Sequence, residues 1–383
     1  MMKILLPTIA LSCLPIHAAT RQDQLDQLAQ RGWKHVMEVF YSPKTKLIYT
    51  SLPSKVTKAR HFDNGLLQWF EGLSYGRGME DTPILGGLAL DMLVDQYNVT
   101  KDESLKEEAY KIFQGMDNLV NAHPYKGFLA RGLCEEDGKS ICALTSRDQH
   151  THFFHGLWNY FNSPLPDDAT KAKIQSLFTD IAELMIRNVT EENDWHFLQA
   201  DGSKDPRGLS KMWNVYPHEA SRLPMIYIAT WDVTKKQRYW DEYIKWADKT
   251  LEASLQLPQQ PDSLINGVMP PYAFLQMNTS LELILKIDPD PQRKTKLRQA
   301  MQFPAELAAK KAPPMDAGNG RYLCSCAELA LTQLLTPDFP FDKIQSELVA
   351  KALLEPPVDI VASCRAVHVI AAYWKARANG VEF

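Results

Sequence analysis

The sequence lacks a long apolar run beyond its N-terminus, a continuous block of basic residues and a Gly/Ser-rich linker. The most apolar stretch, residues 4–16, is too short to cross a bilayer as a helix, so we expect no membrane span in the mature chain. Lys and Arg are dispersed and the net charge is −4, which argues against a nucleic acid as partner. Without a linker or a repeat of fixed period, the chain is expected to form one large domain.

The first residues have the order of a secretory signal. A short basic start that contains Lys3 precedes the apolar stretch, and the small residues Ala18 and Ala19 follow it. We therefore expect residues 1–19 to be a signal peptide that is removed. Residues 20–383 would then form a single domain that is secreted or periplasmic.

Helical periodicity dominates the rest of the chain, and convincing alternating strands are scarce. Residues 46–51 and 127–133 are the candidates for short strands. The expected helices are 21–40, 62–71, 83–97, 103–121, 146–162, 168–188, 216–231, 235–255, 271–286, 292–310, 322–335, 341–354 and 361–378. Helices in this number with short connections form either an α-solenoid or a closed toroid of six helical hairpins. Because a solenoid usually shows a repeat, we favour an all-α (α/α)6 toroid with few short strands.

The segment from Ser146 to His155 is the most informative. Ser146 followed by Gln149 has the spacing of a capping box, which predicts that a helix starts here. On that helix Asp148, His152 and His155 share one face, and aromatic and aliphatic side chains occupy the other. Such a polar face is typical of a cleft. The alternative is a surface helix with an unusual face.

Residues 72–83 combine glycines with polar and aromatic side chains just before an expected helix. Tyr75, Arg77, Glu80 and Asp81 lie among the glycines, which allow close approach to a ligand. We therefore take these four side chains as candidates for the site. The alternative is a simple turn in which Asp81 caps the helix.

Two further segments carry candidate binding residues. Arg131 follows a glycine-containing stretch at 127–130, and together with Arg147 it could bind a carboxylate or sulfate through the guanidinium fork. The alternative is that either arginine pairs with Glu80, Asp81 or Glu135 inside the protein. Residues 213–222 bring Trp213 and His218 together with further polar and aromatic residues. Both are candidates for binding a ligand. The alternative for Trp213 is that it belongs to the core, as a single aromatic residue of this kind more often does.

Cysteine and metal signals are weak. Cys134 and Cys142 could close the loop between them in an oxidising compartment. Asp148, His152 and His155 could face one metal ion, but the sequence contains no His-Glu-x-x-His motif. We therefore predict neither a metal nor a cofactor.

These segments resemble those of the six-hairpin, (α/α)6-toroid glycosidase-like proteins, which bacteria secrete to degrade acidic polysaccharides. The likeness rests on residues 76–81, 127–132, 146–149 and 156–158, and with the helix count it covers most of the mature chain. The resemblance implies that the mouth of the toroid acts on uronate-containing glycans by hydrolysis or by lyase elimination. Because the chain has no additional β-sandwich domain, which many such lyases carry, we favour hydrolysis.

The resemblance thus implies a glycoside hydrolase with a carbohydrate substrate that contains uronate. Hydrolysis needs two carboxyl groups, one to protonate the leaving oxygen and one to activate water or attack. Asp148, in the first turn of its helix, is assigned as base or nucleophile. Glu80 or Asp81 is the candidate acid. The candidate substrate-binding residues are Tyr75, Arg77, Arg131, Arg147, His152, His155, Trp213 and His218.

Two alternatives remain open at this point. In a polysaccharide lyase, Tyr75 or a histidine would abstract the proton beside the uronate carboxyl group. In a non-catalytic glycan-binding protein, the same scaffold would bind an oligosaccharide without turnover, since a fold does not fix a function.

Overall fold

The computed structural model describes residues 20–55, 79–141, 144–261, 265, 269–311, 320–341, 343–356 and 365–383. The expected signal peptide at 1–19, the expected helix at 62–71, Tyr75, Arg77 and Cys142 lie outside these residues. Among the helices that are described, none combines the length and the apolar character that a membrane span requires.

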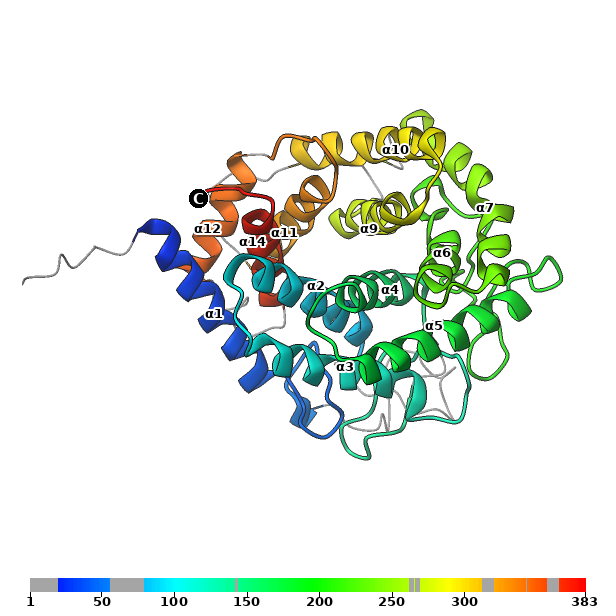
Figure 1. The fold of residues 1–383 in the computed structure, drawn as a ribbon, viewed down its shortest axis with the longest axis horizontal. Coiled ribbons are helices and arrows are strands. Elements are labelled where there is room, and N and C mark those ends of the chain that lie inside the picture. The colour runs from blue at the N-terminus through cyan, green and yellow to red at the C-terminus, as the bar shows by residue number, and fades with distance from the viewer. Residues whose placement is uncertain are drawn as a thin grey trace, which may run out of the picture.

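The described helices form two concentric rings (Figure 1). The inner ring consists of α2 (Thr82–Thr100), α4 (Arg147–Phe161), α6 (Arg222–Thr234), α9 (Pro271–Ile287), α11 (Gly320–Leu334) and α14 (Ala366–Ala378). Each inner helix contacts the next, and α14 closes the ring on α2. The outer ring consists of α1 (Arg21–Val39), α3 (Leu105–Asn121), α5 (Asp168–Asn188), α7 (Gln237–Leu255), α10 (Pro291–Lys310) and α12 (Lys343–Leu354).

The chain alternates between an outer and an inner helix, which is the arrangement of an (α/α)6 toroid. Within the described ranges, three short 3-10 helices accompany it: η1 (Pro53–Lys55), η3 (Pro217–Glu219) and η4 (Leu257–Gln259). The all-α toroid expected from the sequence is therefore confirmed.

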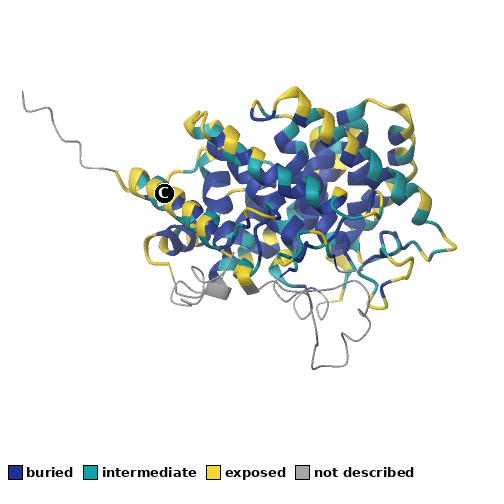
Figure 2. Cartoon of the chain, turned by 90° about the horizontal axis from the view of Figure 1, so that it is seen from below, coloured by how far each residue is buried: buried dark blue, intermediate teal, exposed yellow. Residues whose placement is uncertain are grey.

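The sequences of the two rings differ as their positions require. On the inner helix α9, every residue from Ala273 to Leu285 is buried. On the outer helix α3, buried residues such as Leu105, Ala109 and Ile112 recur at helical spacing and leave a charged face to solvent. Figure 2 shows the same division, with buried residues concentrated in the interior and exposed ones on the periphery.

Two glycines allow the inner helices α2 and α4 to approach closely. A Cβ atom on Gly87 would lie 2.1 Å from the carbonyl oxygen of His152, and one on Gly156 would lie 2.2 Å from the carbonyl oxygen of Gly87. Any larger residue at these positions would push the two backbones apart. The contact therefore fixes the relative position of the two helices whose first turns carry site residues.

The interior of the inner ring contains a buried ionic network. Lys375 on α14 lies 3.0 Å from Asp91 and 2.8 Å from Asp95, two carboxylates on α2. Burial raises the pKa of Asp95 to about 6, although Lys375 opposes this. His155 on α4 approaches Glu282 on α9, with 3.0 Å between Nε2 and Oε2. Because buried charges are costly unless they are paired, these contacts keep the helices in register.

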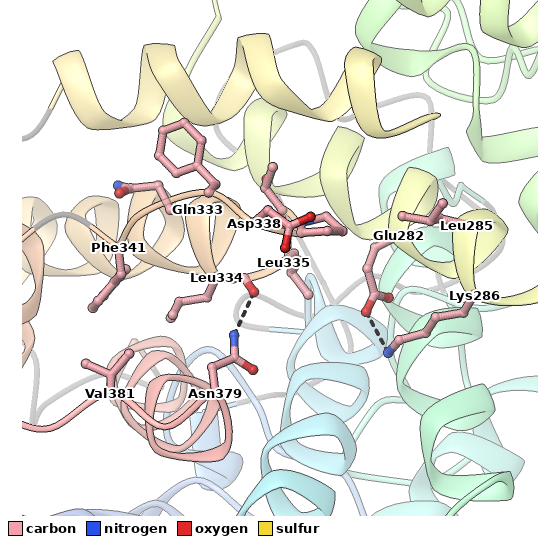
Figure 3. Close-up of a pocket in the computed structure, with 13 residues that line it drawn as sticks. Glu282, Leu285, Lys286, Gln333, Leu334, Leu335, Asp338, Phe341, Asn379 and Val381 are labelled. Carbon is pink, nitrogen blue, oxygen red and sulfur yellow. Dashed lines mark hydrogen bonds and ion pairs between the residues drawn. The ribbon is translucent and has the colours of Figure 1, made fainter. Parts of the chain in front are cut away.

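Beyond this network lies a cavity of about 520 Å³ at the C-terminal ends of α9, α11 and α14 (Figure 3). Glu282 and Lys286 form an ion pair of 2.6 Å on its wall. Asn379 donates a hydrogen bond of 2.9 Å to the carbonyl of Leu334 beside it. Glu282 thus belongs both to the network and to this wall.

Local details correct several sequence-based expectations. The helix expected at 216–231 is divided into η3 and α6, because Pro224 has no amide hydrogen and fits only the first turn of a helix. The expected strands at 46–51 and 127–133 are wrong for the described residues, where isolated bridges such as Tyr41 with Ile48 and Leu133 with Ile141 occur instead. These short pairings are too isolated to build a sheet.

The start of α4 is placed as expected, but not for the expected reason. Ser146 is the N-cap residue, yet its side chain makes no capping hydrogen bond. The side chain of Gln149 does not reach back to Ser146 but donates to Asp81 at 2.7 Å. The capping box is therefore wrong, because a tertiary contact with the start of α2 takes Gln149 away.

Replacing Gly156 with alanine should lower the free energy of unfolding. The clash with a backbone carbonyl cannot be relieved by a side-chain rotation, and overpacking typically costs about 1–3 kcal/mol. Gly32→Ala is the control, since its Cβ would meet only the mobile end of Ile370, at 3.2 Å. Chemical denaturation checks both variants. Equal stability of Gly156→Ala and wild type would contradict the close α2–α4 contact.

Candidate functional site

Two adjoining cavities lie where the inner helices begin. The large cavity has a volume of about 610 Å³ and the small cavity about 300 Å³. First-turn or N-cap residues of α2, α4, α6, α9 and α14 line them, so the N-termini of these five helices converge here, and α11 adds Cys324 and Glu328 from its second and third turns. Because the positive ends of the helix dipoles meet at this point, the site favours negative charge. The four residues that line both cavities are Ser146, Asp148, Leu209 and Tyr272.

Asp148 stands between the two cavities, in the first turn of α4. It forms an ion pair with Arg222 of α6, whose side chain is only 1% exposed, whereas the side chain of Asp148 is 27% exposed. Burial opposes ionisation of Asp148, but Arg222, Arg147 and Arg131 together outweigh it and hold the pKa of this carboxyl below its usual value. Asp148 is therefore an anion that faces the cavities.

Arg147 is engaged within the protein. Its Nε donates to Glu219 at 2.8 Å, and Nη1 donates to the carbonyls of Gly208 at 2.6 Å and Lys211 at 3.0 Å. An internal pairing was the alternative that the sequence left open, but the partner of Arg147 is Glu219 and not Glu80, Asp81 or Glu135. Arg147 thus fastens the loop at 208–211 against the start of α4.

Asp81 and Arg131 meet on the wall of the large cavity. Nη2 of Arg131 lies 2.6 Å from Oδ1 of Asp81, the same oxygen that accepts a hydrogen bond from Gln149. Asp81 is the N-cap residue of α2 and has a φ of 66°, a left-handed conformation that aspartate tolerates better than most residues. Its side chain remains 43% exposed, so it is accessible from the cavity.

Glu328 of α11 is a site residue that sequence reasoning missed. It lines the large cavity, and burial raises the pKa of its carboxyl to about 7 although Arg365 opposes this. In the sequence it stands between Ala327 and Leu329, within a segment that has the apolar pattern of an ordinary core helix. The available signal was the isolated carboxylate on an otherwise apolar segment.

Two neutral histidines complete the wall of the large cavity. Burial lowers the pKa of His152 on α4 to about 3 and that of His368 on α14 to about 4. Each imidazole is thus unprotonated near neutral pH. In this state a histidine can accept a proton or donate a hydrogen bond, according to its tautomer.

The other sequence-based candidates lie elsewhere. His155 is one turn deeper than His152 and belongs to the buried network around Glu282. Trp213 packs against Trp246, with 4.8 Å between the ring centroids, and lines neither cavity among the described residues. Glu80 is half-buried before α2 and likewise lines neither cavity. His218 lines the small cavity, while Tyr75 and Arg77 lie outside the described residues.

One group of side chains has the spacing of metal ligands. Donor atoms of Cys324, Glu328 and His368 all lie within 4.8 Å of one another. The guanidinium of Arg365, however, acts electrostatically on both Glu328 and His368. A fixed positive charge beside the group opposes the binding of a cation, so we assign no metal to it.

The comparisons with known proteins concern the fold. No protein-family model matches the sequence, and no curated protein sequence matches it significantly. A family 76 glycoside hydrolase (mannosidase) from Bacteroides thetaiotaomicron aligns with a TM-score of 0.51 and 11% identity, over 93% of this chain and 99% of that one. A sugar epimerase from a ruminal bacterium aligns with a TM-score of 0.54 and 11% identity, over 93% and 100%.

An unsaturated glucuronyl hydrolase specific for heparin aligns with a TM-score of 0.52 and 10% identity, over 94% of this chain and 99% of that one. At such identities the likeness concerns the fold alone. The chain has the six-hairpin (α/α)6 toroid fold of glycosidase-like proteins, as its sequence led us to expect.

Proposed function

We propose that the protein is a glycoside hydrolase that uses Asp148 and Glu328 as its two carboxyl groups. One observation carries this proposal. The two side chains line the same cavity, and their surroundings move their pKa values in opposite directions, below the usual value for Asp148 and up to about 7 for Glu328. Two carboxyl groups separated in this way suit the roles of base and acid.

The roles follow from the charges. Glu328, which a pKa of about 7 leaves about half protonated at neutral pH, would donate its proton to the glycosidic oxygen as the bond to the sugar breaks. Asp148, held ionised by Arg222, would activate water or attack the anomeric carbon. Glu328 replaces Glu80 and Asp81 as the first candidate acid. Asp81 remains the second, because it is open to the large cavity.

The substrate we propose is a glycan that contains an acidic sugar, such as a uronate. Arg131, Arg207 and Arg365 line the large cavity, and the converging helix N-termini add positive potential. Arg131 forms an ion pair with Asp81, and Arg207 forms an ion pair with Asp205. A carboxylate on the sugar would meet guanidinium groups at this wall, which suits the bidentate geometry of arginine. The name of the glucuronyl hydrolase with this fold supports the same class of substrate.

The site of action we propose is outside the cytoplasm. This rests on the N-terminal residues alone, whose basic start, apolar stretch and small residues have the order of an export signal.

A second candidate function is proton transfer at a sugar carbon, by elimination or by epimerisation. His152 and His368 line the large cavity as neutral imidazoles, and such groups can abstract a proton beside a carboxyl or carbonyl group. A sugar epimerase shares the fold. Product analysis separates the three reactions: new reducing ends for hydrolysis, an unsaturated product that absorbs ultraviolet light for elimination, and an epimer of unchanged mass for epimerisation.

Replacing Asp148 with asparagine should lower kcat/KM for glycan hydrolysis by at least about 10³-fold, because the variant cannot act as base or nucleophile. The measurement is the release of reducing ends from uronate-containing oligosaccharides. Asp180→Asn, which removes a carboxylate of the outer helix α5 that is paired with Lys126 and lines neither cavity, is the matched control. Thermal unfolding checks that Asp148→Asn remains folded with Arg222 unpaired. Preserved hydrolysis in a folded Asp148→Asn protein would refute the assignment.

The pH dependence should show Glu328 as the acid. Since the acid must be protonated, kcat/KM should fall about tenfold per pH unit above about pH 7, the pKa of Glu328. The acidic limb should lie below pH 3.8, where Asp148 becomes protonated. Glu328→Gln should lose the alkaline limb along with about 10²–10⁴-fold of its rate. Glu306→Gln, an exposed position on α10, should keep both limbs. An unchanged alkaline limb in Glu328→Gln would exclude Glu328 as the acid.

A further inference from the structure

The small cavity adjoins the large one at four shared residues, and Asp148 is one of them. Glu328 lines only the large cavity and Tyr216 only the small one. A ligand that fills both cavities would therefore lie beside Asp148. The small cavity's volume, about 300 Å³, lies at the lower end of the range for ligand pockets, about 300–1,000 Å³.

Two exposed tyrosines form part of the wall of the small cavity. Tyr216 is 56% exposed and Tyr272 is 46% exposed, although large aromatic side chains are usually covered in a folded protein. The ring of Tyr216 is stacked on that of His218, with centroids 5.8 Å apart and an angle of 11° between the planes. This stacking holds the tyrosine ring in place as a flat apolar surface.

The same wall contains buried polar atoms that lack a partner. Nδ1 of His218 and Oε2 of Glu219 make no hydrogen bond within the described part of the chain, and each residue is only 8% exposed. Both residues line the small cavity. Buried polar groups without partners are uncommon, and hydroxyl groups of a ligand would satisfy a donor or acceptor at these positions.

The charges around the small cavity cancel in pairs. Arg147 is paired with Glu219, and Arg222 is paired with Asp148. Burial also keeps His218 uncharged near neutral pH by lowering its pKa to about 4. The small cavity therefore differs from the large one, whose wall carries Arg131, Arg207 and Arg365.

We infer that the small cavity is a second sugar subsite, which binds an uncharged sugar ring against Tyr216 on the far side of Asp148 from the acidic sugar. This inference rests on the proposed function and adds that the glycan pairs an acidic unit with a neutral one. The ring would stack on Tyr216, and its hydroxyl groups would hydrogen-bond to His218 and Glu219.

Binding without turnover tests the inference. The probes are methyl glycosides of glucose, galactose and mannose, with methyl glucuronoside as the acidic counterpart, titrated into the full chain and followed by saturation-transfer NMR. At least one neutral glycoside should bind, and Tyr216→Ala should weaken it by about five- to tenfold. Tyr216→Trp should restore binding. Tyr110→Ala, which removes a tyrosine 39% exposed on the outer helix α3, should have no effect.

Methyl glucuronoside should bind equally well to wild type and to Tyr216→Ala. Several results would overturn the inference: no binding of any neutral glycoside, the same binding in Tyr216→Ala as in wild type, an equal loss in Tyr110→Ala, or an equal loss for the glucuronoside. Because these measurements need no turnover, they separate the subsite from the hydrolase proposal. If Tyr216→Ala lost binding of the neutral glycoside alone, and the wild type cleaved no glycan, the subsite would stand and the hydrolase proposal would be rejected.

Discussion

The ion pair between Arg222 and Asp148 is the interaction on which the account of the site depends. Arg222 is almost completely buried at the start of α6, and a buried guanidinium needs a negative partner. Asp148, at the start of the neighbouring inner helix α4, is that partner. The pairing keeps the carboxylate ionised while leaving part of it open to both cavities. The same contact thus neutralises the buried guanidinium of Arg222 and keeps Asp148 ionised for chemistry.

The toroid explains why such a contact forms at this end of the ring. An alternating series of outer and inner helices makes the inner helices parallel, so their N-termini and the positive ends of their dipoles gather around one region. Asp148 is stabilised there as an anion. Glu328 lies on α11 more than one turn beyond the N-terminus, where burial dominates and raises its pKa. One wall therefore holds carboxyl groups in two different states.

Much of the fold could be predicted because the information is local. Helical periodicity and the prolines between helices placed most helix boundaries within a few residues, as for the helices at 168–188 and 271–287. The helix expected at 216–231 begins later, at Arg222, because Pro224 fits only the first turn of a helix. The polar face of α4 also drew attention to Asp148 and His152, which do line the large cavity.

The partners of the site residues could not be predicted, because they depend on contacts between distant elements. The sequence offered Arg147 as a ligand for substrate, but Glu219 and two loop carbonyls occupy it. Nothing in the sequence indicates that Arg222 approaches Asp148, 74 residues away along the chain. His152 and His155 share one helical face. His155 contacts Glu282 because it lies one turn further along α4, and the sequence alone does not show which side chain of α9 lies there.

We propose that Asp148 and Glu328, in one cavity, take up protons at widely separated pH values. Carbon-13 NMR of the side-chain carboxyl groups, assigned with Asp148→Asn and Glu328→Gln, measures this directly as pH is varied. Glu328 should titrate near pH 7 and Asp148 below pH 3.8. If each group titrated at its ordinary pKa, 3.8 for Asp148 and 4.5 for Glu328, the proposed division of roles would be contradicted.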